Sequence, residues 1–216
     1  MKRLLHMLIL VAAASAAAAS HAAPSVELKV TGVIRPAACT PTLAGDGVVD
    51  YGNISSATLR QGQTTALPAR QVVLTVSCNA AAKIALAVVD NRSSTRLAGI
   101  TDGIKAGADY NFGLGMVAGK KVGGYVLSFE SGATADGRGV SGLVSSDLGN
   151  SWNGGNSFIQ HEGNYYTFSD NGTQPSVQKV LSAQIKVQPV LNKAEELPLT
   201  QDVALDGSAT IEVKYL

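Results

Sequence analysis

The chain has 216 residues, of which 45% are hydrophobic, 15% are charged and 5% are aromatic, and its formal net charge at pH 7 is +1. This near-neutral balance, without a block of basic residues, argues against nucleic acid as a partner. The length suits one domain of sandwich or barrel size with enough chain for a hydrophobic core. The 23 glycines among few charged and few aromatic residues favour a turn-rich, all-β protein.

The first 22 residues have the pattern of a secretory signal peptide. A basic start at Lys2 and Arg3 precedes an apolar run over residues 4–11, and an alanine-rich stretch then leads to small residues that favour cleavage after Ala22, with cleavage after Ala19 as the alternative. A membrane anchor is the alternative, but the run is short for a span of about 20 strongly apolar residues. Cleavage lowers the basic count from 17 to 15 against 16 acidic residues. We therefore expect an exported, near-neutral chain.

Residues 26–34 alternate apolar and polar side chains, which predicts an extended strand. One face of that strand carries Val26, Leu28, Val30, Gly32 and Ile34. Burying its four aliphatic side chains at about 1.5–3 kcal/mol each would contribute roughly 6–12 kcal/mol. That is comparable with the whole stability of a domain, about 5–15 kcal/mol. The glycine leaves a gap on the apolar face, which indicates close approach of another backbone or a bulky side chain; a bulge in an ordinary first strand is the alternative.

The chain has two cysteines, Cys39 and Cys78. An even number of cysteines behind a signal peptide indicates an oxidising compartment and a disulfide. In the chain-entropy model, closing a loop of about 40 residues contributes roughly 4 kcal/mol. A two-ligand metal site or a redox pair would need a neighbouring histidine or a C-x-x-C spacing, and neither occurs. We predict a structural disulfide.

The middle of the chain contains several β-branched or alternating runs. Residues 71–78 and 83–90 are predicted strands, and the small and polar residues 79–82 between them look like a hairpin connection. No apolar period of 3.6 residues persists, so we expect little helix. The stretch 131–163 is rich in Gly, Ser and Asn, which predicts long surface loops or an irregular hairpin within one domain. Further strands are predicted at 110–117, 124–129, 165–168, 182–188 and 210–215.

The chain ends inside a second alternating segment, residues 209–216. A strand near each end of the exported chain, without a closing turn or cap, indicates strand edges that are available to another chain. This is a signal for assembly and not for catalysis.

The sequence carries little that points to an enzyme. His161 lies beside Glu162 in a polar stretch, where we expect a solvated loop histidine, and no nucleophile motif accompanies it. We therefore expect no catalytic residues, no cofactor and no metal. Trp152, with Tyr165 and Tyr166 close in sequence, could form an aromatic platform for a sugar, or equally could fill the core beneath loops.

Three segments together resemble the subunits, or pilins, of chaperone–usher fimbriae of Gram-negative bacteria. Residues 30–39 (VTGVIRPAAC) are similar to a pilin donor strand that runs into the first cysteine. Residues 47–54 (GVVDYGNI) resemble the segment that follows it, and Tyr215 corresponds to the aromatic residue that pilins carry second from the end. Pilin C-terminal motifs also include an upstream glycine, for which Gly207 is the nearest candidate. The resemblance covers roughly the first and last thirds of the exported chain.

The resemblance implies an all-β, immunoglobulin-like (incomplete, pilin-type) β-sandwich with an N-terminal donor-strand extension. Its expected parts are a signal peptide at 1–22, the donor-strand extension at 23–35 and the sandwich at 36–216. A periplasmic chaperone would first lend the missing strand, and the extension of the next subunit would then replace it. The expected interface for chaperone and neighbouring subunits is Ile211, Val213, Tyr215 and Leu216.

The implied function is that of a structural subunit of a fimbria that contributes to adhesion. Its partners would be the periplasmic chaperone, an outer-membrane usher and neighbouring pilin subunits, and the chain would pass through the periplasm to the cell surface. The alternative is a secreted or tip-located β-sandwich that binds a host glycan or receptor. A tip adhesin normally carries a separate lectin domain before its pilin domain, whereas here the donor-like strand begins the exported chain.

Overall fold

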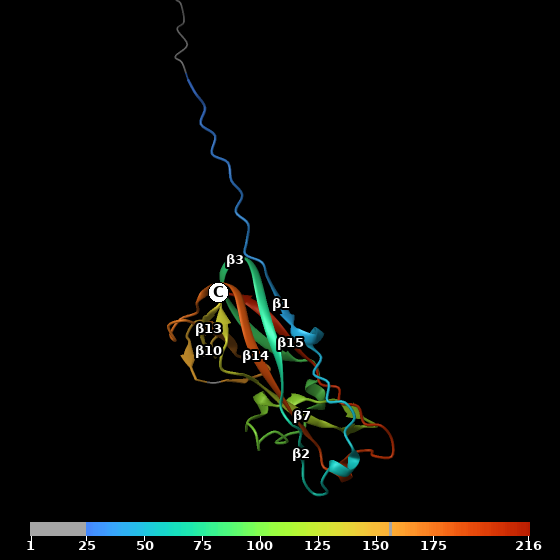
Figure 1. Cartoon of the computed structure of the whole chain (residues 1–216). Coiled ribbons are helices and arrows are strands. Elements are labelled where there is room, and N and C mark those ends of the chain that lie inside the picture. Colours follow the sequence, from blue (N-terminus) through green and yellow to red (C-terminus); the bar gives the residue numbers. More distant parts are fainter. Residues whose placement is uncertain (1–24, 156) are drawn as a thin grey trace, which may run out of the picture. The chain divides into compact units, whose positions relative to one another are not determined.

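The computed structural model describes residues 25–155 and 157–216, and Figure 1 shows the whole chain. The chain divides into two units, residues 1–35 and residues 36–216, and each is described by itself. The predicted signal peptide at 1–22 lies outside the described residues. Among the residues that are described, no helix has the length and apolar character needed to span a membrane.

Strands and short 3-10 turns build the unit of residues 36–216, here called the body. Its longer strands are β3 (Arg70–Asp90), β7 (Gly123–Phe129), β14 (Val177–Leu191) and β15 (Ala209–Tyr215), and those of five residues are β1 (Cys39–Leu43), β10 (Ser141–Ser145) and β13 (Tyr165–Ser169). Strands of two residues are β2 (Thr65–Ala66), β4 (Phe112–Gly113), β5 (Met116–Val117), β6 (Lys120–Lys121), β8 (Thr134–Ala135), β9 (Arg138–Gly139), β11 (Asn153–Gly154) and β12 (Phe158–Ile159). The 3-10 turns are η1 (Ala44–Gly47), η2 (Ser56–Thr58), η3 (Ser93–Thr95), η4 (Ala108–Tyr110) and η5 (Ala194–Glu196).

Strand β3 takes part in both sheets of the body. Its first half pairs with β1 and β14, and the first sheet then continues through β7 to β12. Its second half pairs with β15 and β13, and the second sheet continues through β10 to β11. Every one of these pairs is antiparallel. The body is therefore an all-β sandwich, which confirms the predicted fold class.

The hairpin predicted at 79–82 is wrong, because β3 runs through these residues without a turn. Asn79 to Ala81 are exposed, and they carry the strand from the first sheet toward the second. Small residues without a glycine allow a strand to bend, but they do not supply the positive φ that a tight hairpin requires. Because β3 is continuous, β1 and β15 both pair with it, β1 with residues 74–78 and β15 with residues 84–90.

Alternating side chains of both sheets meet between them and form one core. The largest fully buried apolar side chains on strands come from five strands and are Leu74, Val76, Ile84, Leu86, Val88, Phe112, Ile159, Tyr166, Phe168 and Leu181. Phe129 packs its ring against Tyr166 and Phe168 at centroid distances of 5.8 Å and 5.3 Å. The period of two along each strand is thus the physical basis of the sandwich.

Most predicted strands lie within observed ones. The segments at 124–129, 165–168, 182–188 and 210–215 are confirmed as parts of β7, β13, β14 and β15. The segment at 110–117 is interrupted, because Gly115 has φ +92° and separates β4 from β5. The glycine-rich stretch 131–163 forms short strand pairs and loops within the body, as predicted.

The described part of the first unit, residues 25–35, contains no strand. Val26, Leu28, Val30 and Ile34 are each at least 88% exposed, so the apolar face that the sequence predicts is open to solvent. We call residues 25–35 the arm.

Candidate strand-binding groove

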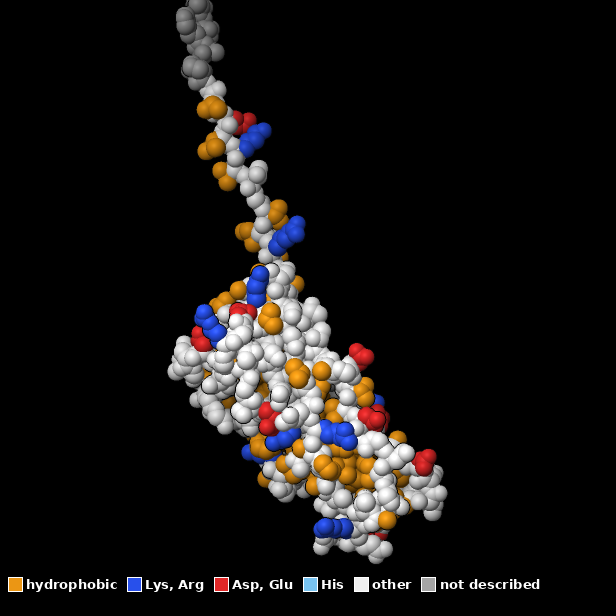
Figure 2. All heavy atoms as spheres, in the orientation of Figure 1, with side chains coloured by type: hydrophobic (Ala, Val, Ile, Leu, Met, Phe, Trp, Pro, Cys, Tyr) orange, Lys and Arg blue, Asp and Glu red, His pale blue; other side chains and the backbone are white. Residues whose placement is uncertain are grey.

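An apolar groove of about 270 Å³ runs between β15 and the segment that begins with β1. Hydrophobic side chains gather on the face of the molecule shown in Figure 2, over the lower half of the body. The residues that line the groove are almost all apolar and are Leu43, Gly47, Val49, Tyr51, Val72, Leu114, Tyr125, Leu127, Ile185, Val187, Pro189, Leu205, Gly207, Ser208, Ala209 and Ile211. They come from both sheets, so the groove is a gap in the sandwich that reaches its core.

The edge of β15 that borders this groove has backbone groups free for pairing. At one end of β15, the carbonyl of Ser208 accepts a hydrogen bond at 3.0 Å from the N–H of Asn91, the residue after β3. At the other end, the N–H of Leu216 donates at 3.1 Å to the carbonyl of Lys83 in β3. In an antiparallel ladder such bonds recur at every second residue. Residues 210, 212 and 214 therefore face β3, and the N–H and C=O groups of residues 209, 211 and 213 point away from it. No described residue of the body makes a hydrogen bond with the three outward N–H groups.

The facing edge of β1 is a poorer template for a strand. Asn79 N–H donates to the Ala38 carbonyl at 3.0 Å, so residues 39, 41 and 43 face away from β3. The N–H of Cys39 already donates to the hydroxyl of Tyr215, and Pro41 has no N–H to donate. A strand that enters the groove therefore finds most of its hydrogen-bond partners on β15.

The predicted disulfide is present and fastens β1 to β3. Cys39 and Cys78 are bonded and face each other directly in the ladder. Beside them the Asn79 side chain accepts a hydrogen bond from Ala38 N–H at 2.8 Å. The β1 border of the groove is thus held by a covalent bond and by local hydrogen bonds, whereas the β15 border relies on its ladder with β3.

Of the four predicted interface residues, the structure places one in the lining of the groove and two others further along β15. Ile211 lines the groove, Val213 packs half-buried against the core, and the Tyr215 hydroxyl reaches across to β1. Leu216 lies elsewhere, because its side chain approaches Gly149 in the loop after β10. The predicted donor residues Val26, Leu28, Val30, Gly32 and Ile34 belong to the separate arm.

The groove carries no charged lining residue, and its two tyrosines stay neutral near pH 7. Burial raises the pKa of Tyr125, whose ring forms part of the floor. Burial also raises the pKa of Tyr51, against a smaller opposing effect of Arg70, and the Tyr51 hydroxyl donates to the Val187 carbonyl at 3.0 Å. The surroundings therefore suit uncharged, apolar side chains.

Several groove residues were not singled out from the sequence. Tyr125 and Leu127 read only as members of a strand, and nothing local indicated that their side chains reach an open gap. Gly207 was singled out as the candidate upstream glycine, and the structure supplies a physical reason for it, since a Cβ at this position would lie 2.8 Å from Cε1 of Tyr125. Its glycine lets the C-terminal segment pass directly over that ring.

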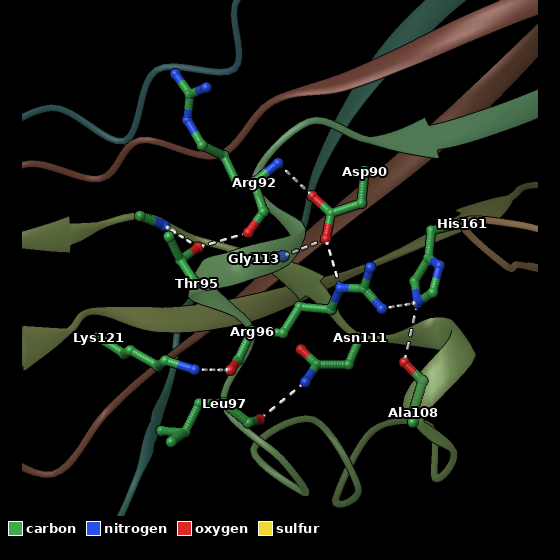
Figure 3. Close-up of polar contacts among 11 residues, drawn as sticks. Asp90, Arg92, Thr95, Arg96, Leu97, Ala108, Asn111, Gly113, Lys121 and His161 are labelled. Atoms are coloured by element: carbon green, nitrogen blue, oxygen red, sulfur yellow. Dashed lines mark hydrogen bonds and ion pairs between the residues drawn. The ribbon is translucent and has the colours of Figure 1, made fainter.

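A second cluster, built around Asp90, lies outside the groove (Figure 3). One carboxylate oxygen of Asp90 accepts the N–H of Arg92 at 2.8 Å, and the other accepts that of Gly113 at 3.1 Å and forms an ion pair with Arg96 Nε at 2.9 Å. Arg96 Nη1 lies 2.6 Å from Nε2 of His161. This buried network connects the end of β3 to the loops that follow it.

The expectation of a solvated His161 is wrong. The residue is 3% exposed, its Nε2 lies 3.2 Å from the Ala108 carbonyl oxygen, and Phe112 packs edge-on against its ring. A histidine next to a glutamate in a polar stretch is typical of an exposed loop. The sequence does not show that Arg96, from another loop, contacts the His161 ring. Among the described residues no three His, Cys, Asp or Glu side chains converge in a metal-binding group.

The three aromatic residues considered as a sugar platform do not share a surface. Tyr166 is 2% exposed and belongs to the core. Trp152 and Tyr165 are half-buried and flank Gly149, next to Leu216. Asp147 holds this loop, since it accepts hydrogen bonds from the Ser151 hydroxyl at 2.6 Å and the Ser145 hydroxyl at 2.7 Å.

Comparison with known proteins places the chain among relatives from Escherichia coli (strain K12). It is 28% identical to "Uncharacterized protein YhcF" over 235 aligned residues, which cover 97% of this chain and 98% of YhcF. It is 36% identical to "Protein GltF" over 76 residues, which cover 33% of this chain and 30% of GltF. Residues 28–143, more than half of the chain, match the family described as "Protein of unknown function (DUF1120)". The chain belongs to this DUF1120 family.

Proposed function

We propose that the chain is a structural subunit of a chaperone–usher fimbria, assembled by donor-strand exchange between copies and contributing to adhesion. The observation that carries the proposal is the outward edge of β15, whose N–H groups at residues 209, 211 and 213 have no partner in the body and border an open apolar groove. The occupant of the groove would be the arm of a neighbouring subunit.

The direction of the incoming strand follows from the body. All strand pairs there are antiparallel, and antiparallel pairs are slightly more stable per residue. Residues that face each other across such a pair share one face of the sheet. The side chains of Ala209, Ile211 and Val213 point toward the core, so arm residues opposite them would point inward as well.

We propose a register for the arm. Because the Tyr215 side chain reaches across to Cys39 at one end, we take Val213 as the first position on β15 that faces the arm. The inward-facing arm residues Val26, Leu28 and Val30 then lie opposite Val213, Ile211 and Ala209. The two remaining inward positions extend past β15: Gly32 lies opposite Gly207, and Ile34 lies opposite Leu205.

The register gives the mid-strand glycine of the arm a physical reason. Opposite it, the C-terminal segment already passes over the Tyr125 ring, with Leu114 Cδ1 3.2 Å from the Cβ that Gly207 lacks. A side chain at position 32 would add volume where the gap is narrow. The apolar residues on either side of Gly32 would enter wider parts of the groove.

The energetics favour a subunit that receives its missing strand from outside. Burial of the four aliphatic side chains of the arm would stabilise the complex by about 1.5–3 kcal/mol each, or roughly 6–12 kcal/mol in total. Before two subunits join, a periplasmic chaperone would cover the outward edge of β15. An outer-membrane usher would then receive the subunit from the chaperone. The Cys39–Cys78 bond suits an oxidising compartment such as the periplasm.

Deleting residues 23–34 tests the proposal. The secreted chain with and without this segment is compared for polymers by sedimentation and for complexes with a co-expressed chaperone. The full chain should polymerise and the deletion variant should not, although the latter should still bind chaperone. Stable monomers of both forms, without any chaperone bound, would contradict the proposal.

A second candidate function is binding of a host glycan or receptor, favoured by a cavity of about 570 Å³ on the far edges of both sheets. Its wall includes Gly142 and Gly154 in strands β10 and β11, where neither a positive φ nor a close neighbour requires glycine. Strand glycines without a packing reason can mark close approach of a ligand. Replacing Gly142 with Val should then abolish glycan or host-cell binding, and unchanged binding would remove this candidate.

A further inference from the structure

We infer that Arg35 of an incoming copy pairs with Asp202 at the end of the groove, and that this pair, together with the apolar contact of Ile34, fixes the register of the inserted arm. The inference rests on the proposed strand exchange and adds to it a charged junction between two copies of the chain. The recognition chemistry is that of one guanidinium and one carboxylate at the point where the apolar contact ends.

A second pocket of about 340 Å³ adjoins the groove beyond β15. Leu205 lines both cavities. The second pocket is lined mainly by apolar and neutral side chains, and Asp202 is the one charged residue in its wall. A strand that leaves the groove at Leu205 therefore passes a single carboxylate.

Asp202 differs from the other acidic residues of this segment in being unpaired. Glu195 accepts the Gly62 N–H at 3.0 Å, Glu196 pairs with Lys120 at 3.4 Å, and Asp206 pairs with Arg92 at 2.8 Å. Asp202 is exposed, and no cation of the described chain lies within ion-pair distance of it. It is the carboxylate available to a charge from outside.

The arm supplies the complementary charge at the matching position. With Ile34 opposite Leu205, the next residue, Arg35, emerges opposite position 204, where its long side chain reaches the carboxylate two residues away. Arg35 is exposed, and no described residue lies within ion-pair distance of it. Pro36 follows without an N–H, so pairing of the added strand ends there.

The pair and the apolar contacts of the arm together select one register. A shift of the arm by two residues toward β15 would place Arg35 opposite Asp206, whose carboxylate Arg92 already pairs, and would move it away from Asp202. A shift by two residues in the other direction would keep Arg35 beside Asp202 but would move Ile34 from Leu205 to Val203, out of the groove. Charge complementarity of this kind sets orientation and partner choice more than raw affinity.

The experiment measures binding of a fluorescent peptide of residues 25–36 to the whole secreted chain by anisotropy at low and moderate salt. Four combinations are compared: unchanged peptide or R35E peptide, with unchanged protein or the D202K protein. Each single charge reversal should weaken binding about 3- to 10-fold, and the double reversal should restore most of it. The control protein E162K makes the same charge change at an exposed residue outside both cavities and should bind like the unchanged chain.

The outcomes separate this inference from the function on which it rests. A V30D peptide that fails to bind, beside an unchanged peptide that binds, supports groove occupancy. If the peptides bind through the groove but D202K behaves like E162K, the charged junction is wrong while strand exchange stands. If the unchanged peptide does not bind at all, both are wrong. If each single charge reversal weakens binding but the R35E peptide does not recover binding to the D202K protein, the proposed Arg35–Asp202 pair is also wrong.

Discussion

The backbone N–H of Cys39 donates a hydrogen bond to the hydroxyl of Tyr215 at 2.7 Å, and this contact joins the two strand edges that border the groove. It links the disulfide end of β1 to the last residue of β15, positions that are 176 residues apart in the chain. The contact thus bridges the two borders of the groove at one end, and Leu205, which also lines the second pocket, lies at the other.

Replacing Tyr215 with Phe should open the closed end while keeping the ring. The lost hydrogen bond is solvent-exposed, so the free energy of unfolding should fall by about 0.5–1.5 kcal/mol at most. Hydrogen exchange at the Cys39 amide, followed by NMR, should accelerate, because this N–H would lose its acceptor. Unchanged protection of that amide would show that the contact does not form in solution. The Y215A variant serves as the comparison in which the ring is also removed.

Replacing Gly32 with Leu should impair assembly without affecting the fold of the subunit. In the isolated chain no atom lies within 4 Å of the position that a Cβ would take, so thermal unfolding should remain unchanged. In the groove the extra volume would overpack the site opposite Gly207 at a cost of about 1–3 kcal/mol, which corresponds to strand exchange slower by about 5- to 150-fold. Polymerisation kinetics measure this effect.

The neighbouring substitution Thr31→Leu provides the matched control for G32L. Thr31 lies on the opposite face of the extended arm, so a leucine there should leave the rate of exchange nearly unchanged. Equal slowing by both substitutions would contradict the assigned face of the strand.

Acid should release the loop that Asp147 organises. Hydrogen bonds from the Ser151 and Ser145 hydroxyls lower the pKa of Asp147 to about 2 from an ordinary 3.8. Because the folded-state pKa is the lower one, the stabilisation of the loop is complete above the ordinary pKa and is lost as pH falls from about 4 to about 2. Fluorescence of Trp152, the single tryptophan of the chain, should report this change.

The variant Asp147→Asn separates that titration from general acid unfolding. It has no carboxyl group at this position, so its tryptophan signal should lack the transition near pH 2 that the unchanged chain shows. The same acid transition in both proteins would assign the change to other groups.

Removing the Asp90 carboxylate should destabilise the body strongly. The Asp90 side chain is 1% exposed, and D90A would leave Arg96 and the N–H of Gly113 without their partner. Breaking a buried ion pair by removing one member costs about 3–5 kcal/mol, which urea unfolding would measure. The comparison variant D206A removes an exposed partner of Arg92 and should have a much smaller effect. Equal losses would contradict the structural role assigned to the buried network.

The sequence predicted those features that depend on neighbouring residues. The alternation at 210–215 marks β15 because its side chains face core and solvent in turn, and the pair Cys39 and Cys78 marks the disulfide because the compartment favours oxidation. It did not predict β1, because a proline in the middle of so short a segment argues against a strand. That strand forms because β3 offers it an antiparallel template.

Features that depend on distant contacts remained outside the reach of the sequence. His161 is buried because Arg96 and Ala108 approach from another loop, and residues 79–82 continue β3 because each half of that strand pairs with a different sheet. Tyr125 lines the groove because the C-terminal segment passes over its ring at Gly207, a contact between residues far apart in the sequence. The predicted strand at 26–34 has no partner among the described residues, and the proposal supplies that partner from another chain.

A cross-link between chains tests the proposed exchange most directly. Cysteines at Leu28 and Ile211, which the register places opposite each other, are introduced together and the protein is analysed without reductant. The account predicts disulfide-linked dimers and longer ladders, and few of these when the cysteine is placed at Lys29, on the opposite face of the arm, instead of Leu28. Monomers alone, or equal cross-linking from both arm positions, would contradict it.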